Sequence, residues 1–140
     1  MSTEVSSHFR PLSREECEQR LGEHRSGRVA WQAADGPMVL PVSYRVHVGK
    51  VSFRTSPYGV LSRLASPTNV AFEIDDIDLD VGTGWSVLVR GRARAVTSSY
   101  VLTTLWKDGP VPWATGTRNL FISIEPHSIS GRLVKAPFAD

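Results

Sequence analysis

The chain has 140 residues and a mass of 15.4 kDa, which suits one domain, and its residues are 41% hydrophobic and 21% charged. This composition excludes wholesale disorder. No apolar run approaches the roughly 18 residues of a membrane-spanning helix, and the first ten residues lack the apolar stretch of a secretory signal. Cys17 is the single cysteine, which excludes an internal disulfide and a zinc site built on several thiolates. We expect a soluble, cytoplasmic protein with no membrane partner.

The charges are nearly balanced, with 16 basic against 14 acidic residues and a formal net charge of +2. This excess is too small to indicate a nucleic-acid partner. Acidic residues gather between Glu73 and Asp80, and arginines alternate at Arg90, Arg92 and Arg94. In a strand these three arginines share one face. We interpret them as a solvated or ion-paired sheet face, in preference to a site for polyanions.

The beginning of the chain predicts a tail followed by a short helix. Residues 1–11 are expected to form a flexible tail. Ser13 and Glu16 have the spacing of a capping box, in which each side chain accepts a hydrogen bond from the other residue's backbone N–H. A helix over about 13–22 should follow. We interpret Cys17 as a small core residue, since no neighbour suggests an activated thiolate.

From residue 27 onward the chain reads as strands with short connections. Pro41 lies inside one expected strand and indicates an edge or a bulge, because proline donates no ladder hydrogen bond. Gly91, in the middle of the longest candidate, indicates a bulge or a sharp bend. Six or seven strands predict a mainly antiparallel barrel, which we expect to form one domain over residues 12–140. The expected strands are 28–32, 38–47, 50–55, 69–77, 85–96, 119–125 and a short one at 129–134, and the expected helices are about 57–65 and 98–106.

The strand end at Arg54 and Thr55 is the most informative candidate for binding. Ser56 suits the N-cap of a following helix, and Pro57 suits its first position. A helix N-terminus presents free N–H groups and a positive dipole. Arg54 adds a bidentate donor and Thr55 a hydroxyl. The segment therefore predicts a phosphate site, and the alternative from these residues alone is an ordinary capped helix.

Two further segments carry polar groups on expected strands. Ser43 and Tyr44 follow Pro41, which keeps the strand off a regular ladder, so this surface would suit a planar ring; the alternative is an irregular barrel edge. Trp85 and Ser86 begin the longest strand. Four tryptophans in a small domain usually serve packing and only sometimes ring stacking. The four histidines show no metal-ligand spacing, and no side chain stands out as catalytic.

Six segments occur in an order that resembles a known family. The chain is similar to the pyridoxamine 5'-phosphate oxidase-like family of flavin-binding split barrels, and most of all to its small actinobacterial branch with a GWSVLVRG-type strand. The resemblance covers about residues 12–134. The segments that carry it are Gly27–Ala30, Gly36–Tyr44, Phe53–Ser56, Val70–Asp75, Gly84–Ala93 and Ile129–Arg132.

The resemblance implies a six-stranded antiparallel split β-barrel with short helices, which forms a homodimer with two FMN sites at the subunit interface. It assigns residues to the cofactor segment by segment. Those implied for the phosphate and ribityl end are Arg54, Thr55 and Ser56; those lining the isoalloxazine are Pro41, Val42, Ser43 and Tyr44; and those approaching the ring, from the same or the other subunit, are Trp85 and Ser86.

One position departs from the family pattern. Relatives usually carry a phosphate-binding lysine in the helix after the Arg-Thr pair, and here that position is Val60. Arg63 lies three residues further on, on roughly the same helix face, and is the candidate substitute. Without it, one charge-assisted contact is missing, which would weaken FMN binding by about tenfold to a hundredfold.

These observations predict an FMN-dependent oxidoreductase that acts on a small-molecule substrate. The flavin would carry out the redox chemistry, so no side-chain acid or base is required. The alternative is a non-catalytic protein that binds or stores a flavin, the deazaflavin F420 or haem. F420 has a polyglutamate tail, for which the arginines at 90, 92 and 94 are the candidates, and haem would need His47 or His127 as an axial ligand.

Overall fold

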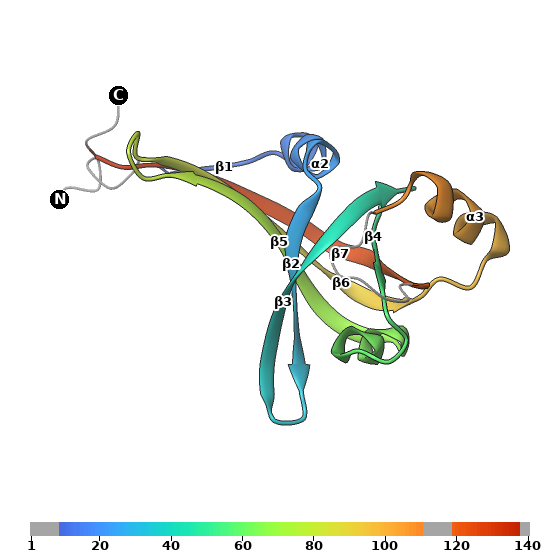
Figure 1. The fold of residues 1–140 in the computed structure, drawn as a ribbon. Coiled ribbons are helices and arrows are strands. Elements are labelled where there is room, and N and C mark those ends of the chain that lie inside the picture. Colours follow the sequence, from blue (N-terminus) through green and yellow to red (C-terminus); the bar gives the residue numbers. More distant parts are fainter. Residues whose placement is uncertain (1–8, 111–118, 138–140) are drawn as a thin grey trace.

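The computed structural model describes residues 9–110 and 119–137 (Figure 1). Within these residues it contains seven strands, two α-helices and one 3₁₀ helix. Neither α-helix in this part of the chain is long and apolar enough to cross a membrane. The strands are β1 (Phe9–Pro11), β2 (Ser26–Ala33), β3 (Gly36–His47), β4 (Lys50–Thr55), β5 (Thr68–Asp78), β6 (Thr83–Ala95) and β7 (Leu120–Lys135), and the helices are α2 (Arg14–Glu23), η1 (Val60–Ala65) and α3 (Ser99–Asp108).

All strand pairings are antiparallel, in the order β1-β7-β4-β3-β2-β5-β6, and a further pairing of β7 with β6 closes the sheet into a barrel. Closure leaves few unpaired edges. The mainly β antiparallel barrel with short helices is therefore as predicted. Figure 1 shows β5, β6 and β7 continuing beyond the barrel as a long arm, with β1 beside β7.

The barrel interior is filled by side chains from alternate positions of the strands. Tyr44, Phe53 and Phe72 are fully buried there. On β6, buried residues alternate with the exposed arginines at 90, 92 and 94, as the two-residue period predicts. Val87 and Phe121 are buried within a single chain, so their burial gives no reason to expect a second subunit.

Helix α2 begins with the predicted capping box. The Ser13 Oγ accepts from the Glu16 N–H at 3.1 Å, and the Glu16 carboxylate accepts from the Ser13 N–H at 2.9 Å. Cys17 is buried, and this burial raises the pKa of its thiol, which agrees with a packing role. Tyr44 joins this helix to the barrel, because its hydroxyl donates to the Leu21 carbonyl at 2.7 Å.

Three expected boundaries differ from the structure. Residues 9–11, expected within the tail, form β1, while residues 1–8 lie outside the described part. The expected strands 119–125 and 129–134 are one strand, β7, because the bulge beside Gly91 absorbs the irregularity at Pro126. A Cβ at Gly91 would lie 2.2 Å from the Glu125 carbonyl oxygen, so the predicted glycine-dependent bulge is confirmed.

The third difference concerns the expected helix over 57–65. The structure has only the 3₁₀ helix η1, which begins at Val60 and is preceded by a turn. Ser56 caps this turn instead of a helix, because its Oγ accepts from the Tyr58 N–H at 3.1 Å and its carbonyl accepts from the Gly59 N–H at 3.3 Å. Such local bonds compete with helix formation. The expected helix N-terminus at Ser56 is therefore wrong.

Candidate functional site

Strand alternation separates the four candidate residues on β3 into two pairs. Tyr44 is fully buried and Val42 is 5% exposed, so both side chains lie in the core. Their side chains therefore do not reach the surface of the sheet, and contact of these two residues with a ring stays a prediction. Pro41 is exposed and Ser43 half-buried, and both lie on the outer face of the sheet. The tyrosine hydroxyl is also engaged with α2, as described above.

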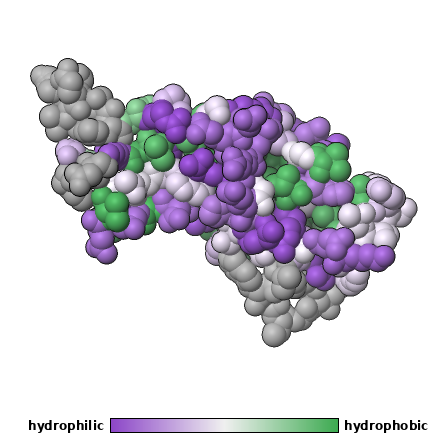
Figure 2. Space-filling view, turned by 90° about the horizontal axis from the view of Figure 1, so that it is seen from above, coloured by the Kyte–Doolittle hydropathy of each residue, from purple (hydrophilic) through white to green (hydrophobic). Residues whose placement is uncertain are grey.

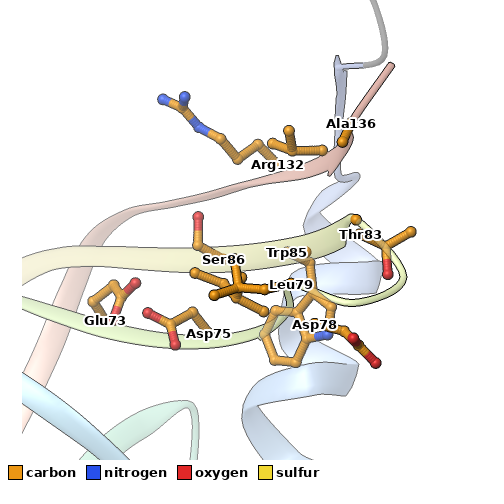
Figure 3. Close-up of a pocket in the computed structure, with 13 residues that line it drawn as sticks. Glu73, Asp75, Asp78, Leu79, Thr83, Trp85, Ser86, Arg132 and Ala136 are labelled. Carbon is orange, nitrogen blue, oxygen red and sulfur yellow. The ribbon is translucent and has the colours of Figure 1, made fainter. Parts of the chain in front are cut away.

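Trp85 and Ser86 are divided in the same way. Figure 3 shows their side chains leaving β6 in opposite directions. The Trp85 ring lies 4.9 Å from the His24 ring and 5.0 Å from the Arg20 guanidinium, toward α2. Ser86 is on the outer face, in register with Asp75 on β5 and Arg132 on β7. Only the serine is therefore placed with Pro41 and Ser43.

A cavity of about 510 Å³ lies along the arm beside Ser86 (Figure 3). We call it the arm cavity. Much of its wall is apolar, and Glu73 and Asp75 lie together at one end of it, which is a usual make-up of a small-molecule site. The residues that line it are Glu73, Asp75, Ile77, Asp78, Leu79, Gly82, Thr83, Gly84, Trp85, Ser86, Arg132, Val134 and Ala136.

Three charged residues occupy the outer face between β3 and β6. Arg28 on β2 is in register with Pro41 on one side and with Glu73 on the other. Its guanidinium lies 2.9 Å from the Glu73 carboxylate and 2.5 Å from the Asp75 carboxylate. Arg28, Glu73 and Asp75 form what we call the outer-face triad. It joins the candidate residues of β3 to Ser86 across the sheet.

The two carboxyl groups of the triad titrate differently. Burial of Glu73, together with the neighbouring Asp75, raises the pKa of Glu73 to about 7. Hydrogen bonds from Glu73 and Arg28 lower the pKa of Asp75. Near neutral pH Glu73 is therefore protonated in part of the molecules, and it can then share its proton with Asp75 or with a bound molecule. One Glu73 oxygen is buried without a hydrogen bond of good geometry, despite its closeness to Arg28.

Sequence reasoning missed this triad. The acidic cluster between Glu73 and Asp80 is visible in the sequence, but it was assigned no role. Their i, i+2 spacing in a strand already indicates that they share a face. The contact with Arg28, some 45 residues away, depends on the pairing of β2 with β5 and had no local signal.

The predicted phosphate segment lies at the end of β4, next to β7. The Arg54 guanidinium is 4.6 Å from the Trp106 ring centre and 5.3 Å from the Phe121 ring centre, so it packs between β7 and α3. Thr55 is 7% exposed. Ser56 holds the turn before η1, as described above. The three residues are consecutive in the chain and lie close together for that reason alone. No helix begins at Ser56, so the expected helix dipole is absent at this position.

Val60, which stands where relatives carry a lysine, and Arg63, its candidate substitute, both lie on η1. Val60 is the first residue of η1 and is 59% exposed. Arg63 is exposed one turn later. For haem, His47 and His127 were the candidate ligands. Neither lines the arm cavity: His47 lies beside the β3–β4 turn, and His127 is exposed on β7.

The antiparallel barrel with its arm has the architecture of a split barrel. Residues 13–133 match the family model described as pyridoxamine 5'-phosphate oxidase, and the chain belongs to this family. An uncharacterized protein of Mycobacterium tuberculosis, Rv0080, is 31% identical over 125 residues, which are 86% of this chain and 82% of that protein.

Solved structures agree with this assignment. The FAD-binding protein of Mycobacterium smegmatis is 31% identical, with a TM-score of 0.77 over 89% of this chain and 98% of that chain. A conserved protein of unknown function from Corynebacterium diphtheriae is 26% identical, with a TM-score of 0.74 over 91% and 98% of the two chains. An FAD-binding protein of Mesorhizobium loti, at 22% identity and a TM-score of 0.70, shares the fold. These matches confirm the family predicted from the sequence.

Proposed function

We propose that this chain binds a flavin nucleotide on the outer face of its barrel and uses it to oxidise or reduce a small molecule. The observation that supports this most directly is the placement of Pro41, Ser43 and Ser86 on one sheet face, with the outer-face triad between them. The M. smegmatis protein, named for FAD binding, adds support at 31% identity. A bound flavin would supply the hydride or electron transfer.

The chain's own residues would bind and orient the flavin ring. Ser43 and Ser86 offer hydroxyl groups to the edge of a ring, and Pro41 offers an apolar surface without an N–H. The triad would present a carboxyl group that gains or loses its proton near neutral pH. The apolar wall of the arm cavity would exclude water from the reacting molecule.

For the phosphate end we propose Arg54, Thr55, Ser56 and Arg63, with FMN as the cofactor. FMN ends in a phosphate monoester, for which a guanidinium and two hydroxyls are suitable partners. FAD is the alternative that the M. smegmatis relative supports. The absence of a lysine at Val60 predicts that the phosphate contributes less here than in a protein that has this lysine.

Titration of the flavin-free protein with riboflavin, FMN and FAD, followed by flavin fluorescence, tests this proposal. FMN should bind more tightly than riboflavin, and Arg54→Gln should reduce this difference. Val60→Lys should increase the affinity for FMN by about tenfold, which is the effect of one charge-assisted contact, and leave the affinity for riboflavin unchanged. Val81→Lys is the matched control, because Val81 is 55% exposed on the β5–β6 connection.

Equal affinities for riboflavin and FMN, with no gain in Val60→Lys, would contradict a phosphate site at η1. Tighter binding of FAD than of FMN would assign FAD as the cofactor. The absorption spectrum of the purified protein separates the alternatives, since flavin, F420 and haem absorb differently. Flavin binding without electron transfer to any tested small molecule would favour a storage protein over an oxidoreductase.

We further propose a homodimer that shares its two sites. The outer face and the arm expose large apolar side chains, among them Val39 at 57% and Ile77 at 63%. Figure 2 shows hydrophobic side chains at the surface of the arm. Large exposed apolar patches often mark interaction sites, and we therefore propose that the second subunit covers this surface.

A further inference from the structure

A second cavity has a volume of about 610 Å³, and none of the three triad residues lines it. It is bounded by the β3–β4 turn, the end of β6 and the first residues of α3, and we call it the α3 cavity. It shares no lining residue with the arm cavity or with the segment Arg54–Ser56. Its lining residues are His47, Val48, Lys50, Ala65, Pro67, Arg94, Ala95, Val96, Thr97, Ser98, Val101 and Ser123.

The polar lining of the α3 cavity consists of nitrogen donors and hydroxyl groups. Lys50 comes from β4 and Arg94 from β6, and Ser123 of β7 is in register with Arg94. None of the described lining residues is acidic. Glu125, outside the lining, approaches Arg94 only to 3.8 Å, and both side chains are more than half exposed. Such a surface pair neutralises little of the charge.

His47 adds an unsatisfied polar atom to this cavity. Its Nε2 atom is buried and has no hydrogen-bond partner. Buried polar atoms in native proteins are nearly always satisfied, and an exception indicates a missing water, ion or ligand. His47 and Lys50 are paired across the β3–β4 turn, so the imidazole and the ammonium enter the cavity from the same hairpin.

Hydroxyl groups complete the donor set. Ser98 accepts from the Val101 N–H as the N-cap of α3, at 3.4 Å, and its own O–H can still donate into the cavity. Ser123 shares a hydrogen bond of 2.8 Å with Ser52. The first turn of α3 also faces this region, and its dipole adds to the positive potential of Lys50 and Arg94.

We propose that the α3 cavity binds the phosphate group of a small organic phosphate monoester. Three anionic oxygens match a guanidinium, an ammonium, an imidazole and hydroxyl donors better than two carboxylate oxygens do. The volume exceeds the need of a bare ion, and the valines and alanines of the wall would contact the organic part. This site is separate from the proposed flavin site and does not depend on it.

Calorimetric titration of the purified full chain with phenyl phosphate, inorganic phosphate and phenol tests the proposal. Phenyl phosphate should bind the cavity saturably and about tenfold more tightly than inorganic phosphate, and Arg54→Gln should leave this binding unchanged, which separates it from the proposed flavin phosphate segment. Phenol should show no saturable binding. Arg94→Gln and Lys50→Gln should each lower the affinity for phenyl phosphate by about tenfold to a hundredfold, because each removes a charge-assisted contact.

Matched control variants separate a site from general charge attraction. Arg92→Gln removes an arginine from the same face of β6, and Lys107→Gln removes a lysine from the other end of α3; neither lines the cavity. Both should bind phenyl phosphate within twofold of the parent, and thermal unfolding should show that all four variants are folded.

Three results would overturn the proposal. They are no saturable binding of phenyl phosphate by the parent, equal losses in the control and cavity variants, or equal affinities for phenyl phosphate and inorganic phosphate. The histidine signals in NMR spectra give a second readout. The His47 imidazole signal, identified by its loss in His47→Asn, should shift on addition of phenyl phosphate, and an unchanged signal would also contradict the site.

Discussion

Val48 is a β-branched residue with a backbone φ of 49°, in the left-handed region that L-amino acids rarely adopt. It forms the β3–β4 turn with Gly49, whose φ is 73°. A two-residue hairpin turn with both φ values positive is the type that favours Asn-Gly. The valine side chain is 82% exposed, so packing does not compensate for this conformation.

Replacing Val48 with asparagine should therefore stabilise the protein. We expect Val48→Asn to raise the free energy of unfolding by about 1 kcal/mol, measured by urea denaturation. The matched control is Val46→Asn, because Val46 is also partly exposed but belongs to strand β3. That variant should lose stability, since asparagine disfavours strands. A lower free energy of unfolding in Val48→Asn would show that the turn conformation is not strained.

Glu73 carries the second prediction at this scale. Its pKa is about 7 in the folded protein, against a usual value of 4.5. Between these two values the folded state binds more protons than the unfolded state, so the free energy of unfolding falls as the pH rises from about 4.5 to 7. Below pH 4.5 the contribution of Glu73 is fully present.

The variant Glu73→Gln should remove this fall, because glutamine keeps a neutral hydrogen-bonding side chain at every pH. Urea denaturation at pH 4.5, 5.5 and 7 measures the slope. Glu125→Gln is the control, since Glu125 is exposed on β7. Equal slopes in the parent and in Glu73→Gln would contradict the raised pKa and with it the proton proposed for the triad.

The pairing of β6 with β7 depends on a single residue, Gly91. Their ladder runs from Thr83 to Ala95 and is shifted in register between Arg90 and Gly91. The shift lets one long strand follow both the arm and the barrel. Gly91 allows this because its backbone lies against the Glu125 carbonyl, where a side chain would not fit.

Gly91→Ala should destabilise the protein by about 1–3 kcal/mol, the usual range for overpacking, because the obstacle is backbone and cannot rotate away. Gly22→Ala is the matched control. Nothing lies within 4 Å of a Cβ at Gly22, which is in α2, so that substitution should stabilise by up to about 1 kcal/mol. The unfolding temperatures of the two variants measure this difference. An unfolding temperature of Gly91→Ala equal to that of the parent would mean that the bulge accommodates a side chain.

At the scale of the whole molecule, large apolar side chains on the outer face of the sheet are exposed. No helix in the described part of the chain packs on the arm over Ile77 and Val134, which are 63% and 42% exposed. Phe9, at 50% exposed, extends the same surface through its pairing with Val134. We proposed that a second copy of the chain occupies this face.

Light scattering tests the dimer directly. The parent should have the mass of two chains at micromolar concentration, and Val39→Asp should shift it toward the monomer, because a buried unpaired carboxylate opposes association. Tyr100→Asp is the control, since Tyr100 is 78% exposed on α3 and belongs neither to β3 nor to the arm. A monomeric parent would remove the dimer and the shared sites together.

The sequence by itself determined those features that neighbouring residues decide. The capping box of α2, the alternation of β6 and the bulge at Gly91 all depend on spacing within one segment, and the ordered motifs were sufficient to predict the family. It also selected Ser43 and Ser86, which lie on the outer face.

Only the tertiary structure decided which strands are neighbours and which way each candidate points. The contact of Arg28 with Glu73 requires β2 to pair with β5, and pairing between distant strands has no local signal. Tyr44 is inward because the barrel closes on that face of β3, so its ring packs against Phe72 instead of a ligand. At Ser56, residue preferences alone predicted a helix, but local hydrogen bonds to the Ser56 side chain and carbonyl form a turn, because such bonds compete with helix formation.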